Sequence, residues 1–156
     1  MRYGIVLLKE VLMPLPPQKF REALFQILYS SDFDSQPDEM IAFMMGELKA
    51  THRAMAEAQA QANQIVAQLP KIDPLIASAS TEYPFERISR VERTILRLGL
   101  FELFFTPSLP PKVAIAEAIR LCRKFGTPES SQFVHAILDG VYKKNEASIS
   151  KEPLSV

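Results

Sequence analysis

Apolar side chains recur every three or four residues along most of this chain, with polar side chains between them. The first such stretch follows Pro16 and Pro17, and proline is tolerated in a first helical turn because no backbone donor is lost there. Turn-forming polar residues begin at Ser30. The pattern therefore predicts a helix over 17–30, and another helical pattern begins at Pro37.

A long segment rich in alanine and glutamine, residues 49–69, comes next. Alanine has the highest helix propensity, so this segment predicts a long helix. Proline in a helix interior removes a hydrogen bond and clashes with the preceding turn, so we expect Pro70 to end the helix. Asp73 and Pro74 then begin a short predicted helix that runs through Ala79.

A capping box marks the start of the most apolar helix. Ser89 is followed three residues later by Glu92, a spacing in which each side chain can accept a backbone hydrogen bond from the other residue. The helix is predicted to run to about Phe105. Its wide apolar face predicts that it is the most buried helix of the set.

Two further helices follow a proline-rich break. The first is predicted over 111–125, with Gly126 as a left-handed C-terminal cap. Thr127 is the predicted N-terminal cap of the second, with Pro128 at its first position. This last helix is expected to reach about Asn145.

The fold class follows from these patterns. No stretch alternates apolar and polar residues for long enough to predict a strand, and no internal repeat is evident. The chain is predicted to be all-α, with about seven helices in a domain over residues 17–146. Residues 1–16 are expected to be an N-terminal extension, disordered or an extra segment, and residues 147–156 a flexible tail.

Composition narrows the class of protein. The chain has 18 basic and 18 acidic residues, so any contact with nucleic acid would require a local basic patch. Its one cysteine, Cys122, cannot form an internal disulfide, which fits a reducing compartment such as the cytoplasm. No apolar run reaches the roughly 18 residues that a membrane span requires.

The second half of the chain carries a recognisable series of motifs. They are Val113-Ala114-Ile115, Glu117-Ala118-Ile119, Phe125-Gly126, Phe133-Val134 and Leu138-Asp139. With these motifs the chain closely resembles the NusB family of bacterial transcription antitermination factors, over about residues 17–142. The resemblance implies two packed helical subdomains.

The resemblance also implies a function. Members of this family are non-enzymatic proteins that bind boxA-type single-stranded RNA of ribosomal RNA operons together with NusE, a small-subunit ribosomal protein that doubles as a transcription factor. The bound RNA is thereby tethered to elongating RNA polymerase, which suppresses early termination. No cofactor is implied. The resemblance also leaves a homodimer that hides the RNA surface as an alternative, because some relatives form one.

The first helix carries candidates for RNA binding. The family has an arginine-rich stretch here, which the resemblance places at Lys19 and Arg21; arginine's planar fork suits phosphates and base edges. Tyr29, where the family also has tyrosine, either touches RNA or packs with its hydroxyl in water. Three neighbouring positions often basic in the family are not basic here: Pro17, Gln18 and Phe20. Two solvated charges are the alternative, and a shallower salt dependence is expected.

The turn between the last two helices is the stronger RNA candidate. A helix N-terminus favours phosphate, and Phe125 and Phe133 offer faces on which unpaired bases can stack. Arg120, Arg123 and Lys124 supply positive charge. The resemblance places this turn beside RNA, with these candidates: Lys124, Phe125, Gly126, Glu129, Gln132 and Phe133. The alternative is that both rings belong to the core.

The capped apolar helix carries a basic stripe, Arg90, Arg93 and Arg97, along one side. The resemblance implies that this helix contributes to the NusE-binding surface, with Glu92, Arg93 and Arg97 as candidates. The alternative is a solvated face in which the Glu92 carboxylate serves its own helix cap. One carboxylate cannot readily do both, and the sequence favours the cap.

Other chemistry finds no support in the sequence. His52 and His135 are too isolated for a metal site, which needs three or four ligands. No nucleophile set and no Gly-rich cofactor loop is present, so an enzyme is not expected, including a fragment of an RNA methyltransferase. The neutral net charge and the depleted arginine stretch motivate one alternative function, a helical protein-interaction module with reduced RNA affinity.

Overall fold

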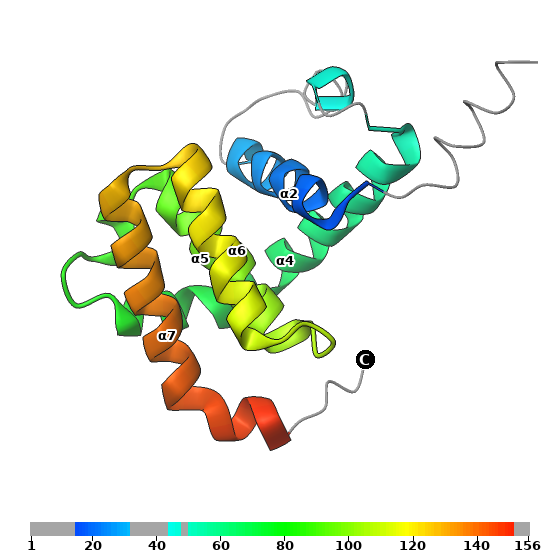
Figure 1. Cartoon of the computed structure of the whole chain (residues 1–156). Helices are drawn as coiled ribbons and strands as arrows, with labels where there is room; N and C mark the ends of the chain where they lie inside the picture. The colour runs from blue at the N-terminus through cyan, green and yellow to red at the C-terminus, as the bar shows by residue number, and fades with distance from the viewer. Residues whose placement is uncertain (1–14, 32–43, 48–49, 152–156) are drawn as a thin grey trace, which may run out of the picture. The chain divides into compact units, whose positions relative to one another are not determined.

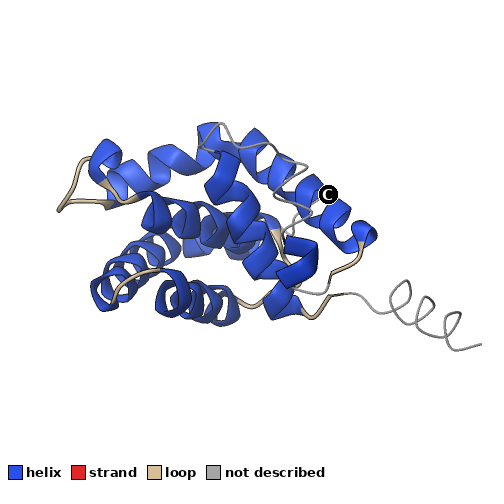
Figure 2. Cartoon of the chain, turned by 90° about the horizontal axis from the view of Figure 1, so that it is seen from above, coloured by secondary structure: helices blue, strands red, loops and turns tan. Residues whose placement is uncertain are grey.

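The computed structural model describes residues 15–31, 44–47 and 50–151, with side chains as far as residue 146. Within these residues every regular element is a helix, as Figure 2 shows. The elements are α2 (Pro17–Ser31), α4 (His52–Ala79), the 3-10 turn η1 (Phe85–Arg87), α5 (Arg90–Phe105), α6 (Pro111–Phe125) and α7 (Pro128–Lys151) (Figure 1). The all-α prediction is confirmed. All but the last two residues of the predicted extension over 1–16, and most of the predicted helix from Pro37, lie outside the described residues.

The chain divides into two compact units, Met1–Gln64 and Ile65–Val156, with the boundary inside α4. In the first unit, α2 begins at Pro17 as predicted. Its buried side chains follow the helical spacing of the sequence, and one of them is charged: Glu22, Ala23, Leu24, Phe25, Ile27 and Leu28.

The α4 helix departs from the prediction. It continues through both Pro70 and Pro74, so the expectation that Pro70 ends it was wrong. A proline inside a helix costs about 3 kcal/mol. Ile65, Ile72 and Ile76 are all at most 1% exposed, and burying one such side chain contributes roughly 1.5–3 kcal/mol. Packing of this apolar stripe therefore offsets the two prolines, a tertiary effect that propensity does not contain.

Three helices make the core of the second unit, and α5, α6 and α7 each pack against the other two (Figure 1). Gly99 lies where they meet. A side chain at Gly99 would have its Cβ 3.2 Å from Cδ1 of Leu138 in α7 and 3.6 Å from Cβ of Ala118 in α6. The glycine therefore permits the close approach of α5 to both neighbours. This core carries the ends of α6 and α7 that form the candidate site.

The helix limits in this unit largely follow the sequence signals. Ser89 caps α5, and α6 spans the predicted residues 111–125. The last helix is longer than expected, because α7 ends at Lys151 and not at Asn145. The first part of the predicted tail is therefore helical.

Candidate nucleic-acid interface

The predicted RNA-binding turn is a tight corner, residues 123–127, between α6 and α7. Gly126 has φ −111° and ψ −153°, which is extended backbone, so the predicted left-handed cap was wrong. Its N–H donates to the Cys122 carbonyl oxygen at 2.8 Å. A Cβ at this position would lie 3.0 Å from that carbonyl oxygen and 3.0 Å from Oγ of Ser130. Glycine is required here by close approach and not by backbone conformation.

A reciprocal cap begins α7. The Ser130 N–H donates to Oγ1 of Thr127 at 3.3 Å, and the Thr127 N–H donates to Oγ of Ser130 at 3.2 Å. The prediction that Thr127 caps this helix is confirmed. The cap also uses two backbone donors, and Pro128 has none. This helix N-terminus therefore offers an anion fewer N–H groups than the sequence suggested, and nearby cations become the more important attraction.

Glu92 is engaged differently from the sequence prediction. Its N–H donates to Oγ of Ser89 at 3.2 Å, which is one half of the predicted capping box. Its carboxylate does not complete the box, because Oε1 accepts the hydroxyl of Ser130 at 2.9 Å. The preference for the carboxylate serving its own cap was wrong. The carboxylate joins α5 to the first turn of α7 across 38 residues of sequence.

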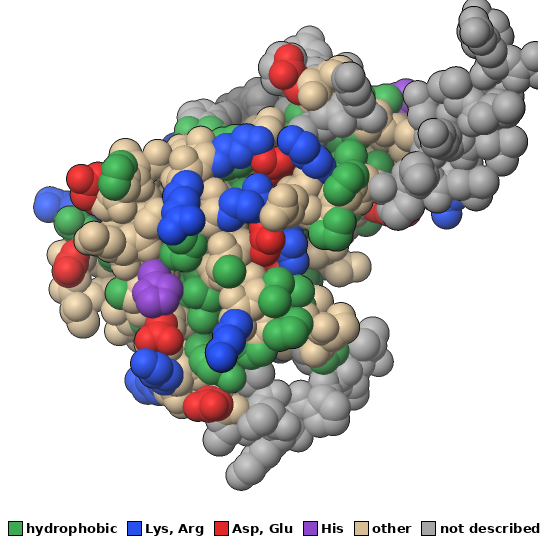
Figure 3. Space-filling view, viewed as in Figure 1, with side chains coloured by type: hydrophobic (Ala, Val, Ile, Leu, Met, Phe, Trp, Pro, Cys, Tyr) green, Lys and Arg blue, Asp and Glu red, His purple; other side chains and the backbone are tan. Residues whose placement is uncertain are grey.

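The corner is open and basic on the α6 side. Arg123 and Lys124 are exposed, and the Phe125 ring is half-buried with the Lys124 ammonium 5.8 Å from its centre. Arg120 contributes less, since its guanidinium binds Glu117 at 2.6 Å. In the view toward α6, Lys and Arg side chains recur on the surface with fewer acidic side chains between them (Figure 3). The corner can therefore present cations and part of an aromatic face to a nucleic acid.

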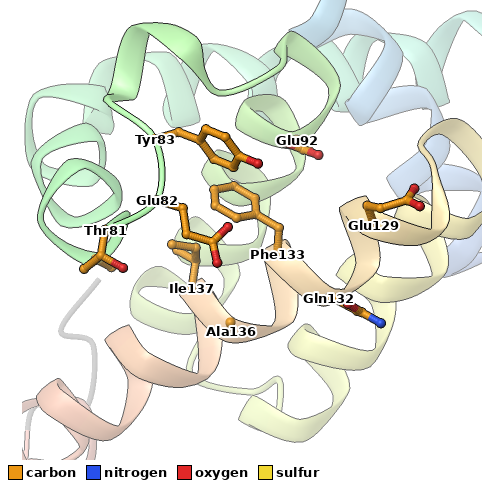
Figure 4. Close-up of a pocket in the computed structure, with 10 residues that line it drawn as sticks. Thr81, Glu82, Tyr83, Glu92, Glu129, Gln132, Phe133, Ala136 and Ile137 are labelled. Atoms are coloured by element: carbon orange, nitrogen blue, oxygen red, sulfur yellow. The ribbon is translucent and has the colours of Figure 1, made fainter.

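The half-buried ring of Phe133 belongs to a different surface. It lines an open pocket of about 390 Å³ and packs edge-to-face on Tyr83, with ring centres 5.7 Å apart (Figure 4). Three carboxylates also line this pocket: Glu82, Glu92 and Glu129. Acidic walls repel phosphate, whereas aromatic faces with carboxylates suit cations or the amino edges of bases. Gln132, also at the rim, points away from the two rings (Figure 4).

The pocket was not foreseen from the sequence. Tyr83 is 48% exposed and lies in the loop after α4, fifty residues from Phe133. Nothing local marks Tyr83 or Glu82 as pocket residues. Ser130 was equally unmarked, although it lies between Phe125-Gly126 and Phe133-Val134, two of the motifs that carry the family resemblance.

In the other unit, the α2 candidates are only partly available. Lys19 lies 3.5 Å from the carboxylate of Glu22, which is buried. Arg21 is half-buried, and Tyr29 is half-buried and stacked on Phe25 with ring centres 5.8 Å apart. These contacts favour a weaker electrostatic contribution from α2 than the family's basic stretch implies.

Arg93 and Arg97 of α5 make contacts within their own unit. Nε and Nη2 of Arg97 donate to Oδ1 and Oδ2 of Asp73 in α4, each at 2.9 Å. The guanidinium groups of Arg93 and Arg97 lie 5.4 and 5.7 Å from the centre of the Phe85 ring. Arg97 therefore holds the end of α4 against α5, while Arg93 and Glu92 are half-buried at the surface. The partner-binding role of all three residues stays a prediction.

Two other expectations concern membrane spans and metal sites. Among the described helices, none has the length and hydropathy needed to cross a membrane. In the same part of the chain, no group of three His, Cys, Asp or Glu side chains is placed to hold a metal ion. Both histidines are exposed.

Comparison with known proteins gives the family. The NusB family profile matches residues 18–143. This chain belongs to the NusB family. The transcription antitermination protein NusB of Chlamydia pneumoniae is 32% identical over 142 residues, which cover 90% of this chain and 88% of the relative.

Solved NusB structures have the same fold. T. maritima NusB matches with a TM-score of 0.72 at 31% identity, covering 85% of this chain and 94% of the other. A chain in the structure of the antitermination factors NusB and NusE in complex with double-stranded RNA matches with a TM-score of 0.68 at 26% identity, covering 81% and 96%. The fold predicted from the NusB resemblance is therefore confirmed.

Proposed function

We propose that this protein is an RNA-binding transcription antitermination factor that acts without catalysis, in the cytoplasm, together with NusE. Membership of the NusB family supports the proposal. So does the likeness to a chain in a complex of NusB, NusE and RNA. The observation that carries it is the corner itself, where Arg123 and Lys124 are exposed beside the half-buried ring of Phe125.

The corner would hold RNA by charge and stacking. Lys124 and Arg123 attract the phosphates, and Phe125 supplies a face for an unpaired base. Backbone donors play a smaller part, because the reciprocal cap occupies the N–H groups of Thr127 and Ser130. Few cations act together, so the protein alone binds RNA weakly. NusE raises the affinity by adding surface, and RNA must raise the affinity for NusE by the same factor.

A titration of fluorescent boxA RNA tests the proposal. The protein is titrated alone and with saturating NusE, against a scrambled RNA of equal length and composition. We expect a preference for boxA that grows when NusE is present. The slope of log affinity against log salt should also be shallow, at about −0.7 for each phosphate contacted in a single strand.

The same titration distinguishes the RNA-binding proposal from one alternative function. The pocket beside Phe133 has acidic and aromatic walls, which favours a helical protein-interaction module with reduced RNA affinity. If the protein with NusE binds boxA no better than the scrambled RNA, the RNA-binding proposal fails. Retained NusE binding in that experiment would support the module.

A further inference from the structure

Glu92 belongs to two surfaces at once. Its side chain lines the pocket that holds the Phe133 and Tyr83 rings (Figure 4). Its Oε1 also accepts the hydroxyl of Ser130 at 2.9 Å. A ligand that draws the carboxylate into the pocket must therefore compete with, or reorient, the hydrogen bond to Ser130.

Ser130 in turn sets the backbone of the corner. It is only 3% exposed, and its Oγ accepts the N–H of Thr127 at 3.2 Å. The space that a Cβ of Gly126 would fill lies 3.0 Å from the same Oγ. A shift of the Ser130 hydroxyl therefore changes the hydrogen bond to Thr127 and the space beside Gly126. These two residues follow the basic end of α6. A packed interior passes such shifts on because it has little free volume to absorb them.

The hydrogen bond between Ser130 and Glu92 depends on the negative charge of Glu92, so a cation in the pocket can weaken it. A hydroxyl that donates to a carboxylate forms a charge-assisted bond, which is stronger than a neutral one. A basic side chain of a protein partner that entered the pocket would meet the same carboxylate, with Glu82 and Glu129 beside it. Partial neutralisation of Glu92 would weaken its attraction for the Ser130 hydroxyl, and the corner would relax in response.

We propose that the Glu92–Ser130 hydrogen bond transmits protein binding at the pocket to the RNA-binding corner, so that Glu92 and Ser130 are positioning residues for RNA. This inference rests on the proposed function, since it assigns the route by which NusE changes RNA affinity. The proposal also explains why the Glu92 carboxylate lines the pocket and still affects the corner, because Ser130 connects the two.

Removing the hydroxyl tests the link. In Ser130→Ala, three affinities are measured: for boxA RNA alone, for NusE alone, and for RNA at saturating NusE. The coupling factor is the ratio of the RNA affinities with and without NusE, and such factors are typically about 5–150. We expect Ser130→Ala to lower it at least about fivefold, while affinity for NusE alone changes by less than about twofold.

The neighbouring serine provides a matched control. The Oγ of Ser131 is buried without a hydrogen-bond partner among the described residues, so Ser131→Ala removes a similar atom from the same turn. The control is expected to keep the wild-type coupling factor. A thermal melt of both variants shows whether they fold. If folded Ser130→Ala retains the wild-type coupling factor within about twofold, the link is overturned.

The wild-type protein gives a second test that needs no variant. Amide NMR signals of Gly126 and Thr127 are followed while unlabelled NusE is added without RNA. The link predicts shifts at both residues, and unchanged signals at saturation would overturn it. Failure of the proposed function has a separate signature, which is no preference for boxA over scrambled RNA even with NusE. Wild-type protein whose boxA affinity rises with NusE while the Gly126 and Thr127 signals stay unchanged would refute the link alone.

Discussion

The corner at residues 123–127 and the pocket beside Phe133 lie next to the same first turns of α7 but differ in charge. The corner presents Arg123 and Lys124, whereas the pocket presents three glutamates and two aromatic rings. The sequence grouped Phe125 and Phe133 in one RNA site. The structure separates them, and the charges around each ring decide which ligand suits it. An aromatic motif alone therefore predicts a surface but not its partner.

Reversing the basic charges at the corner should have the largest effect. In Arg123→Glu with Lys124→Glu, RNA affinity is expected to fall by roughly 10- to 100-fold at low salt, because two phosphate-attracting charges become repulsive. The matched control is Lys143→Glu with Lys144→Glu, two exposed positions farther along α7. Fluorescence anisotropy measures both. An equal loss in the control would mean that net charge, and not the corner, governs binding.

Removing the Phe133 ring separates stacking on RNA from packing in the pocket. Phe133→Ala should cost less stability than the about 3–5 kcal/mol of a fully buried phenylalanine, because the ring is half-buried. If the ring stacks on RNA, as the sequence predicted, the RNA affinity of the folded variant falls by up to about tenfold, within the range for loss of one stacked base. Urea unfolding measures the loss of stability, and RNA titration measures the change in affinity. Unchanged RNA affinity would assign Phe133 to the pocket alone.

Gly126→Ala should damage the corner while leaving the composition of the pocket unchanged. The new Cβ would lie 3.0 Å from the Cys122 carbonyl oxygen, and relief of this overpacking typically costs about 1–3 kcal/mol. Gly140→Ala in α7 is the control, because nothing beyond the helix's own backbone lies within 4 Å of its Cβ position. Alanine there should stabilise the helix by about 0.5–1 kcal/mol. Equal unfolding free energies for the two variants would contradict the close approach at Gly126.

The α2 candidates should contribute less than the corner. Arg21→Glu is expected to weaken binding to all RNA sequences alike by a few-fold, because a phosphate contact carries no sequence information. The slope of log affinity against log salt should flatten by about 0.7 for the lost contact. A loss confined to boxA RNA would show that Arg21 reads bases.

The smallest expected effect concerns the thiol next to the corner. Burial, and then the negative charge of Glu92, raises the pKa of Cys122 from 9.0 to about 12. The thiol should therefore resist iodoacetamide at pH 8 until the protein unfolds. Because the folded pKa is the higher one, this group's contribution to stability is complete below pH 9 and is lost as pH rises toward 12. Rapid labelling of folded protein at pH 8 would contradict this burial.

Local signals predicted the helices of the second unit well, because their ends are set by local chemistry. Ser89, Thr127 and the proline at position 111 fixed three helix starts. The continuation of α4 through Pro70 was missed because it depends on isoleucines that become buried when the protein folds. Propensity carries no information of that kind.

The site was predicted only in part, for a related reason. The motif around Phe125 and Gly126 is continuous in sequence, so it could be recognised. The Glu92–Ser130 hydrogen bond and the Tyr83–Phe133 contact join residues that are 38 and 50 positions apart. No local pattern marks such pairs. Gly126 was assigned the wrong role because a glycine after a helix usually marks a left-handed cap, whereas here it makes room for Ser130.

The most direct test of the account maps the RNA contact itself. Backbone amide signals of the labelled protein are followed while single-stranded boxA RNA is added, with NusE at saturation throughout. The account predicts the largest changes at residues 123–129, with smaller ones in α2. Changes confined to Thr81, Glu82 and Tyr83 of the pocket, with residues 123–129 unaffected, would contradict it.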